Sequence, residues 1–112
     1  MKPGKQYEDS LYAATALDIS MEQTCDEGRQ FFKIRSEMNE FLLNLHDSQR
    51  TADSGRRVHY LHLALVHLDR VEKEIRVSDV HEEIIRLERI YDKIGSLKML
   101  IMNYIKHLRL QE

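Results

Sequence analysis

The sequence predicts an all-α fold, an antiparallel up-down four-helix bundle built as a single domain over residues 1–112. Apolar residues recur at steps of three and four positions along four long segments, which is the spacing of one helix face. The chain contains only one proline and four glycines, so few residues interrupt these segments. No segment alternates apolar and polar residues, and neither Asn-Gly nor Asp-Gly occurs, so strands and tight hairpins are not expected.

The first two helices are predicted at residues 8–25 and 29–52, separated by Asp26-Glu27-Gly28. The apolar face of the first is the weakest of the four, and it comprises Leu11, Ala14, Leu17 and Met21. Alanines at positions 13, 14 and 16 imply close contact with a neighbouring helix. The apolar face of the second comprises Phe31, Ile34, Met38, Phe41 and Leu45.

The third and fourth helices are predicted at residues 56–76 and 79–109, with Asp53-Ser54-Gly55 as the turn before the third. The apolar face of the third comprises Val58, Leu61, Leu65, Leu68 and Ile75. Ser78 or Asp79 is the candidate cap of the fourth helix, and Glu82 follows Asp79 at the spacing of a capping box. Connections this short make consecutive helices antiparallel neighbours.

The fourth helix carries two apolar rows, and this predicts self-association. The first row comprises Ile84, Leu87, Tyr91, Ile94, Ile101, Ile105 and Leu108. The second comprises Ile90, Leu97 and Tyr104. A helix that is apolar over so wide an arc usually faces a second partner, so the second row is the candidate interface of a homo-oligomer. The alternative is a thicker core within one subunit.

Composition favours a cytoplasmic protein without a membrane segment. Cys25 is the only cysteine, so neither an internal disulfide nor a cysteine-rich metal site is expected, and an unpaired thiol suits a reducing compartment. No apolar run is long enough to cross a membrane, and none follows the N-terminal lysines as in a secretory signal. The net charge is −2, so affinity for nucleic acid would require a local basic patch.

Catalytic signatures are weak, and no enzyme, metal or cofactor is predicted. His59 and His62 have a spacing that can bind a metal, but a site needs a third ligand. Arg76 and His81 have the Arg-x4-His form of a superfamily of helical ribonucleases, which is kept as a remote alternative because the predicted turn at Ser78 separates them. Phosphate-binding glycine loops and nucleophile elbows are absent.

Charge is distributed unevenly along the chain. Residues 1–27 contain two lysines against six carboxylates, whereas residues 56–77 contain five basic and three acidic residues. A phosphate backbone following the third helix would gain salt-dependent affinity by releasing counterions. The candidate nucleic-acid-binding residues are Arg56, Arg57, Arg70, Lys73 and Arg76. An ordinary solvated face is the alternative.

Three stretches resemble one bacterial four-helix-bundle family. Phe32-Lys33-Ile34-Arg35-Ser36-Glu37-Met38 and Phe41-Leu42-Leu43-Asn44-Leu45 are similar to its second helix. The spacing of Leu61, Ala64, Leu68, Val71 and Ile75 is similar to its third, and Asp92-Lys93-Ile94-Gly95 with Tyr104-Ile105-Lys106 to its fourth. The family comprises proteins encoded in 23S rRNA intervening sequences and accessory variability proteins of diversity-generating retroelements. Gly95 would then mark a close approach of another helix.

The resemblance implies a homopentameric barrel of bundles, and in the retroelement branch a scaffold for a reverse transcriptase and its RNA or RNA/DNA hybrid. The Asn-Ile-Ala-Glu-Gly motif typical of intervening-sequence proteins is absent, which favours the retroelement branch. The expected function is therefore a non-enzymatic accessory protein of such a retroelement. An intervening-sequence-type bundle and a pure protein-interaction module remain the alternatives.

Overall fold

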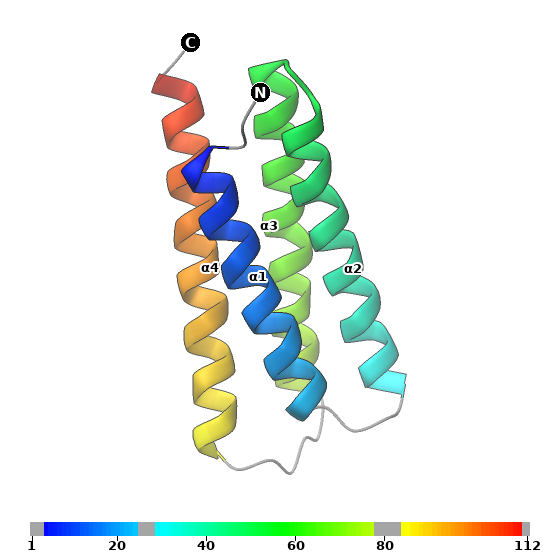
Figure 1. Ribbon diagram of the computed structural model, residues 1–112. Coiled ribbons are helices and arrows are strands. Elements are labelled where there is room, and N and C mark those ends of the chain that lie inside the picture. The colour runs from blue at the N-terminus through cyan, green and yellow to red at the C-terminus, as the bar shows by residue number, and fades with distance from the viewer. Residues whose placement is uncertain (1–3, 25–28, 78–83, 111–112) are drawn as a thin grey trace.

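The computed structural model describes residues 4–24, 29–77 and 84–110, and within them the prediction of four helices without a strand is confirmed (Figure 1). The helices are α1 (Lys5–Thr24), α2 (Arg29–Arg50), α3 (Ser54–Val77) and α4 (Ile84–Leu110). Cys25, the candidate caps Ser78 and Asp79 with Glu82, and His81 of the ribonuclease alternative lie outside the described residues. The side chains of Phe31, Ile84 and Leu87 lie outside them as well.

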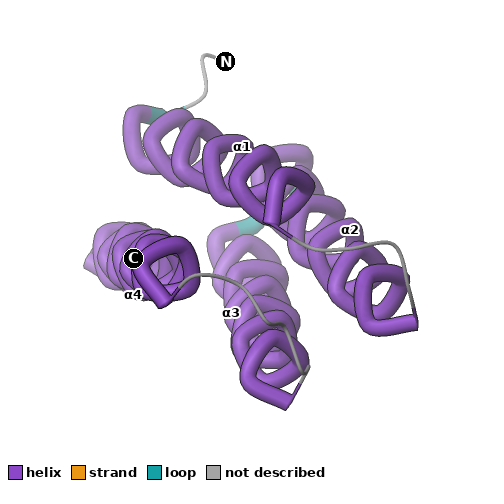
Figure 2. The backbone as a smooth tube through the Cα atoms, turned by 90° about the horizontal axis from the view of Figure 1, so that it is seen from below, coloured by secondary structure: helices purple, strands orange, loops and turns teal. Residues whose placement is uncertain are grey.

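The four helices stand at the corners of a square, each running antiparallel to the next (Figure 2). Contacts join α1 to α2, α2 to α3, α3 to α4 and α4 to α1, while the diagonal pairs stay apart. The most extensive contact is between α2 and α3 and the least extensive is between α1 and α2. The N-terminus of α1 and the C-terminus of α4 therefore lie at the same end of a bundle that measures 46 × 23 × 20 Å.

The connection between α2 and α3 has the predicted three residues but lies two positions earlier, at 51–53, because α2 ends at Arg50 and Ser54 and Gly55 belong to the first turn of α3. Asp53 acts as the N-cap. Its side-chain Oδ1 accepts a hydrogen bond of 3.1 Å from the backbone N–H of Gly55, and its carbonyl accepts one of 2.9 Å from the N–H of Arg57. A capping aspartate satisfies donors that the first turn of a helix leaves free, so α3 begins directly after it.

Most of the predicted apolar positions with described side chains lie in the core or pack against it, but Leu11 of α1 is exposed, which corrects its predicted place on the apolar face. The largest fully buried side chains of the core include Leu17 of α1, Phe41 of α2, Leu68 of α3 and Ile101 of α4. Burying a side chain of this size contributes about 1.5–3 kcal/mol relative to leaving it exposed, so packing dominates the stability of each helix. None of the described helices combines the length and the apolarity that a membrane crossing needs.

In the part of α4 whose side chains are described, both apolar rows are used inside the subunit, which corrects the predicted interface. Ile90, Leu97 and Tyr104 are buried in the core together with Ile94 and Ile101. A helix at the corner of a square bundle has two neighbours, here α1 and α3, so one subunit can bury a wide apolar arc. These three side chains do not form an exposed row for a second copy.

Gly95 also differs from its expectation. It lies on the exposed side of α4, and a Cβ added there would meet no atom within 4 Å outside its immediate surroundings. No other helix of the subunit approaches it closely among the described residues, so packing within the bundle does not require a glycine at this position.

Candidate functional site

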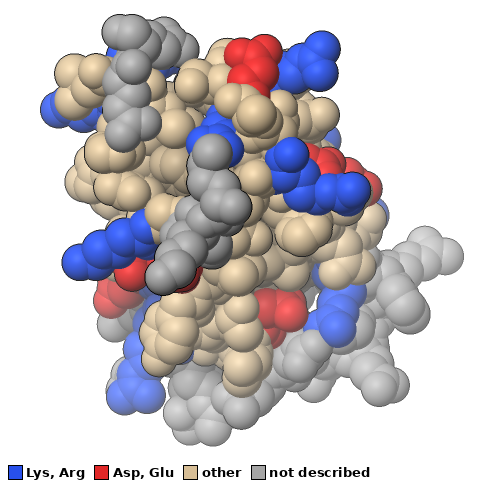
Figure 3. Space-filling model, turned by 45° about the horizontal axis from the view of Figure 1, so that its top comes forward, with Lys and Arg blue, Asp and Glu red and all other residues tan. Residues whose placement is uncertain are grey.

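The five predicted nucleic-acid-binding residues lie on α3 but do not share one face. Arg56 and Arg57 lie near the first turn of the helix, and Arg76 lies at its last. At 1.5 Å per residue, Arg56 and Arg76 are separated by about 30 Å. Successive basic side chains also point in different directions around the helix axis. On the face drawn in Figure 3, lysine and arginine side chains lie scattered among acidic and uncharged ones.

The basic residues at the start of α3 are held by the α2–α3 connection. The Arg57 Nε donates a hydrogen bond of 2.6 Å to the backbone carbonyl of Thr51. The Arg56 Nε lies 3.8 Å from Asp53 Oδ2, although both side chains are largely exposed. Arg56 therefore presents its guanidinium to solvent, whereas Arg57 fastens the connection to the helix.

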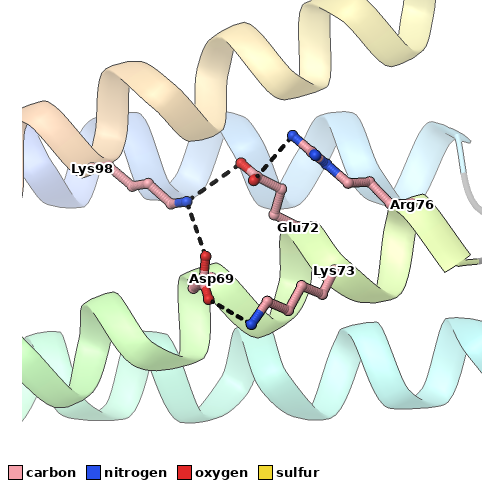
Figure 4. Close-up of polar contacts among 5 residues, drawn as sticks. All are labelled: Asp69, Glu72, Lys73, Arg76 and Lys98. Carbon is pink, nitrogen blue, oxygen red and sulfur yellow. Dashed lines mark hydrogen bonds and ion pairs between the residues drawn. The ribbon is translucent and has the colours of Figure 1, made fainter.

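The basic residues near the end of α3 belong to an ion-pair network with α4 (Figure 4). Lys98 Nζ of α4 lies 3.4 Å from Asp69 Oδ1 and 3.4 Å from Glu72 Oε2. On the same carboxylates, Lys73 Nζ lies 3.3 Å from Asp69 Oδ2 and Arg76 Nη2 lies 3.3 Å from Glu72 Oε1. Two carboxylates are thus shared among three cations, and the local excess is one positive charge.

Two further contacts occupy this end of α3. The Arg76 guanidinium lies 5.4 Å from the centroid of the Tyr91 ring, a cation–π distance. The Lys73 ammonium holds the pKa of the Asp69 carboxyl below its ordinary value of 3.8, with Lys98 adding a smaller effect. Arg70 Nη1 lies 4.0 Å from Glu37 Oε1 of α2. All five predicted residues therefore have partners within the subunit.

The histidines do not assemble into a metal site within the described residues, where no group of three potential ligands occurs. The ring of His59 lies near that of Tyr60, with the centroids 6.0 Å apart. His62 Nε2 lies 3.4 Å from Arg109 Nη2 of α4, so its nearest partner is a cation. His67 instead contacts Glu37 across the α2–α3 interface.

An apolar groove lies between α3 and α4, and sequence reasoning did not single it out. We call it the α3–α4 groove. Its apolar lining is Leu65, Met102, Ile105 and Leu110, and its polar lining is His62, Lys106 and Arg109. The volume is about 480 Å³ and the groove is open to solvent. Met102 and Leu110 expose 55% and 78% of their surfaces.

Toward the middle of the bundle, Lys98 bridges α4 to two carboxylates of α3, and two further apolar side chains are exposed. Val66 of α3 and Met99 of α4 are exposed on the outward sides of the same two helices. Lys106 and Arg109 lie near the C-terminal end of α4, so the α3–α4 groove has a cationic edge there. Methionine side chains are flexible and polarizable, and they are common on surfaces that bind helices.

A second exposed stripe runs along the outer side of α1. Glu8, Tyr12, Thr15 and Ile19 follow one another at steps of four, three and four, and all are exposed. Tyr12 exposes 81% of its surface. We call these four residues the α1 stripe. The spacing of these four residues is present in the sequence, but the core positions Ala14 and Leu17 on another face of the helix obscure it.

Two of the alanines of α1, Ala13 and Ala16, lie toward α4. Ala14 is fully buried, and Ala13 packs against the core. Ala16 and Ser96 help to line a shallower depression of about 260 Å³ between the two helices. The Lys93 ammonium donates a hydrogen bond to the Ser20 hydroxyl across the same interface, so this depression is bordered by a polar contact between α1 and α4.

Comparison of the chain with protein-family models, with curated proteins and with solved structures found no match.

Proposed function

We propose that this chain is a non-enzymatic binding scaffold that takes an amphipathic helix into the α3–α4 groove. The observation that carries the proposal is the exposed apolar lining of the groove, above all Met102 and Leu110, next to the cations Lys106 and Arg109. Grooves between two helices are a recurrent docking site for the apolar face of a third. An apolar floor with a cationic edge favours a helix whose apolar side chains are flanked by carboxylates.

A probe peptide tests this directly. The peptide is a synthetic amphipathic helix of about 18 residues with leucines on one face and glutamates beside them. Fluorescence anisotropy should show binding to the wild-type chain, and Met102→Lys with Leu110→Lys should weaken it by about tenfold or more, because a central apolar contact is replaced by charge.

The matched control is Leu43→Lys, which places a lysine at an exposed leucine on the outer side of α2. This variant should bind the peptide as the wild type does. Equal affinity of the groove variant and the wild type, or no binding by the wild type, would show that the groove is not the docking site.

The more specific role, a retroelement accessory protein that assembles as a pentamer and binds a reverse transcriptase with RNA or RNA/DNA hybrid, rests on the family resemblance of residues 29–108. The exposure of the Arg56 and Lys73 side chains, 76% and 72%, favours a phosphate contact there. Filter binding at about 100 mM salt measures it, because phosphate contacts of this kind weaken steeply with salt.

The variant for this experiment combines Arg56→Gln, Arg70→Gln and Lys73→Gln. Arg57 and Arg76 are left in place, because they also hold Thr51 and Tyr91. RNA retention that is unchanged in the triple variant would exclude this surface as the binding site.

A further inference from the structure

We infer that the helix received by the α3–α4 groove is α1 of a second copy of this chain. The inference rests on the proposed function and adds the identity of the occupant. It is supported by three matches between the α1 stripe and the groove: in apolar surface, in charge, and in the order in which the two occur along the bundle.

The first match is apolar. The α1 stripe exposes Tyr12 and Ile19 to solvent, and no described helix of the same subunit covers them. The groove exposes Met102 and Leu110 in the same way. One contact that joins these surfaces removes apolar area from water on both sides, which is the main driving force for association.

The second match is electrostatic. Between Lys5 and Thr24, α1 contains four carboxylates and one lysine, and Glu8 and Asp9 are exposed. The groove is edged by Lys106, Arg109 and His62. Neither Glu8 nor Lys106 forms an ion pair with a described residue of its own subunit. A copy of α1 is therefore an acidic helix that meets a cationic edge, whereas two α1 stripes facing each other would repel.

The third match is the order of these features. On α1, Glu8 precedes Tyr12 and Ile19 in the direction away from the N-terminus. On α4, Lys106 lies toward the C-terminus, and Met102 and Met99 follow toward the middle of the bundle. The two termini lie at the same end of the molecule (Figure 1). Glu8 can therefore reach Lys106 while Tyr12 reaches Met102, because each helix places its two residues four positions apart, provided that the second copy has the same orientation.

This geometry has a definite symmetry. The α1 stripe and the groove are different surfaces, and α1 and α2 lie on the other side of the bundle from α3 and α4 (Figure 2). Each copy then uses α1 toward one neighbour and the groove toward the other. Such a contact between parallel copies closes into a ring or continues as a chain.

Charge reversal tests the contact. The α1 variant is Glu8→Lys with Asp9→Lys, and the groove variant is Lys106→Glu with Arg109→Glu. Light scattering after gel filtration should give the wild type a mass well above the 13.3 kDa of one chain. Each variant alone brings like charges together and should dissociate about tenfold or more readily. An equimolar mixture of the two should again give a mass well above that of one chain, because each contact between the two variants joins opposite charges.

The control reverses two exposed cations of α2, Lys33→Glu with Arg50→Glu, and should keep the wild-type mass. Restoration in the mixture also proves that both variants are folded. The inference is overturned if the wild type has the mass of one chain, if the variants assemble as the wild type does, or if their mixture fails to assemble. A single-chain wild type that still binds the probe peptide would remove this inference and leave the proposed function standing.

Discussion

Glu37 of α2 and His67 of α3 meet at the most extensive helix interface, with Oε2 of the glutamate 2.6 Å from Nδ1 of the histidine. Both side chains are mostly shielded from solvent, at 24% and 17% exposed. The other carboxylate oxygen, Oε1, lies 4.0 Å from Arg70 Nη1. A single carboxylate thus contacts two polar side chains of the neighbouring helix.

Removing this histidine should cost stability. His67→Ala leaves Glu37 partly buried without its closest partner, and we expect the free energy of unfolding to fall by about 1 kcal/mol. His46→Ala on the exposed side of α2 is the control, since it changes helix propensity equally and removes no such contact. Urea denaturation of both variants measures the difference, and equal stabilities would show that the contact adds nothing.

Two leucines on α2 provide a sharper test of the core. Leu45 is fully buried and Leu43 is 53% exposed, two positions away on the same helix. Leu45→Ala should lower the free energy of unfolding by about 2–5 kcal/mol, because it removes buried methyl groups and leaves a cavity. Leu43→Ala should change it by less than about 0.5 kcal/mol. Equal losses in thermal or urea denaturation would contradict the orientation of α2.

Gly95→Ala should stabilise the chain. The added methyl group has open space around it, and glycine within a helix costs about 1 kcal/mol relative to alanine. We therefore expect a gain of roughly that size in urea denaturation of a dilute sample. Ser96→Ala, at the next exposed position, is the comparison. A loss of stability at position 95 would indicate that another helix does approach it.

The ion-pair network predicts a pH dependence at Asp69. Its folded pKa lies below the ordinary value of 3.8, chiefly because Lys73 stabilises the charged form. The resulting stabilisation is complete above the unfolded pKa and is lost as the pH falls through the folded pKa. An NMR titration of the carboxyl group should give a midpoint below 3.8, and Lys73→Met should raise it more than Lys98→Met does. A wild-type midpoint at or above 3.8 would rule out this account.

The helices were predictable because the spacing of apolar residues along the sequence indicates which side chains are buried. Met38, Phe41 and Leu45 were expected on the inner face of α2, and all three are buried. The boundaries were less accurate where a cap decides them, as at Asp53, because Ser54-Gly55 resembles a turn in sequence yet continues the helix in space. The rows of α4 were recognised, but spacing alone does not reveal whether a second neighbour belongs to the same subunit.

The candidate sites were harder to predict, for two physical reasons. Basic residues that are close together in sequence, such as Arg70, Lys73 and Arg76, point in different directions from the helix axis. Each lies near a carboxylate of its own helix or of an adjacent one. The groove exists only because Leu65 of α3 comes to lie beside Ile105 and Met102 of α4. Packing makes neighbours of residues that are far apart in the sequence, and the order of residues along one chain does not reveal these contacts.

The buried polar groups of the core have a consequence for how the helices keep their positions. Ser10, Asn44 and Ser48 are buried, and each donates a hydrogen bond to a carbonyl of its own helix, at Gln6, Glu40 and Leu45. None of these three hydrogen bonds joins one helix to another. They would therefore remain intact if one helix shifted by one turn along its neighbour. The positions of the helices along the bundle axis must then depend on the packing of the apolar side chains and on surface ion pairs between helices, such as that of Lys98 with Asp69. Weakening these ion pairs and apolar contacts would let the helices shift along one another before the helices themselves unfolded.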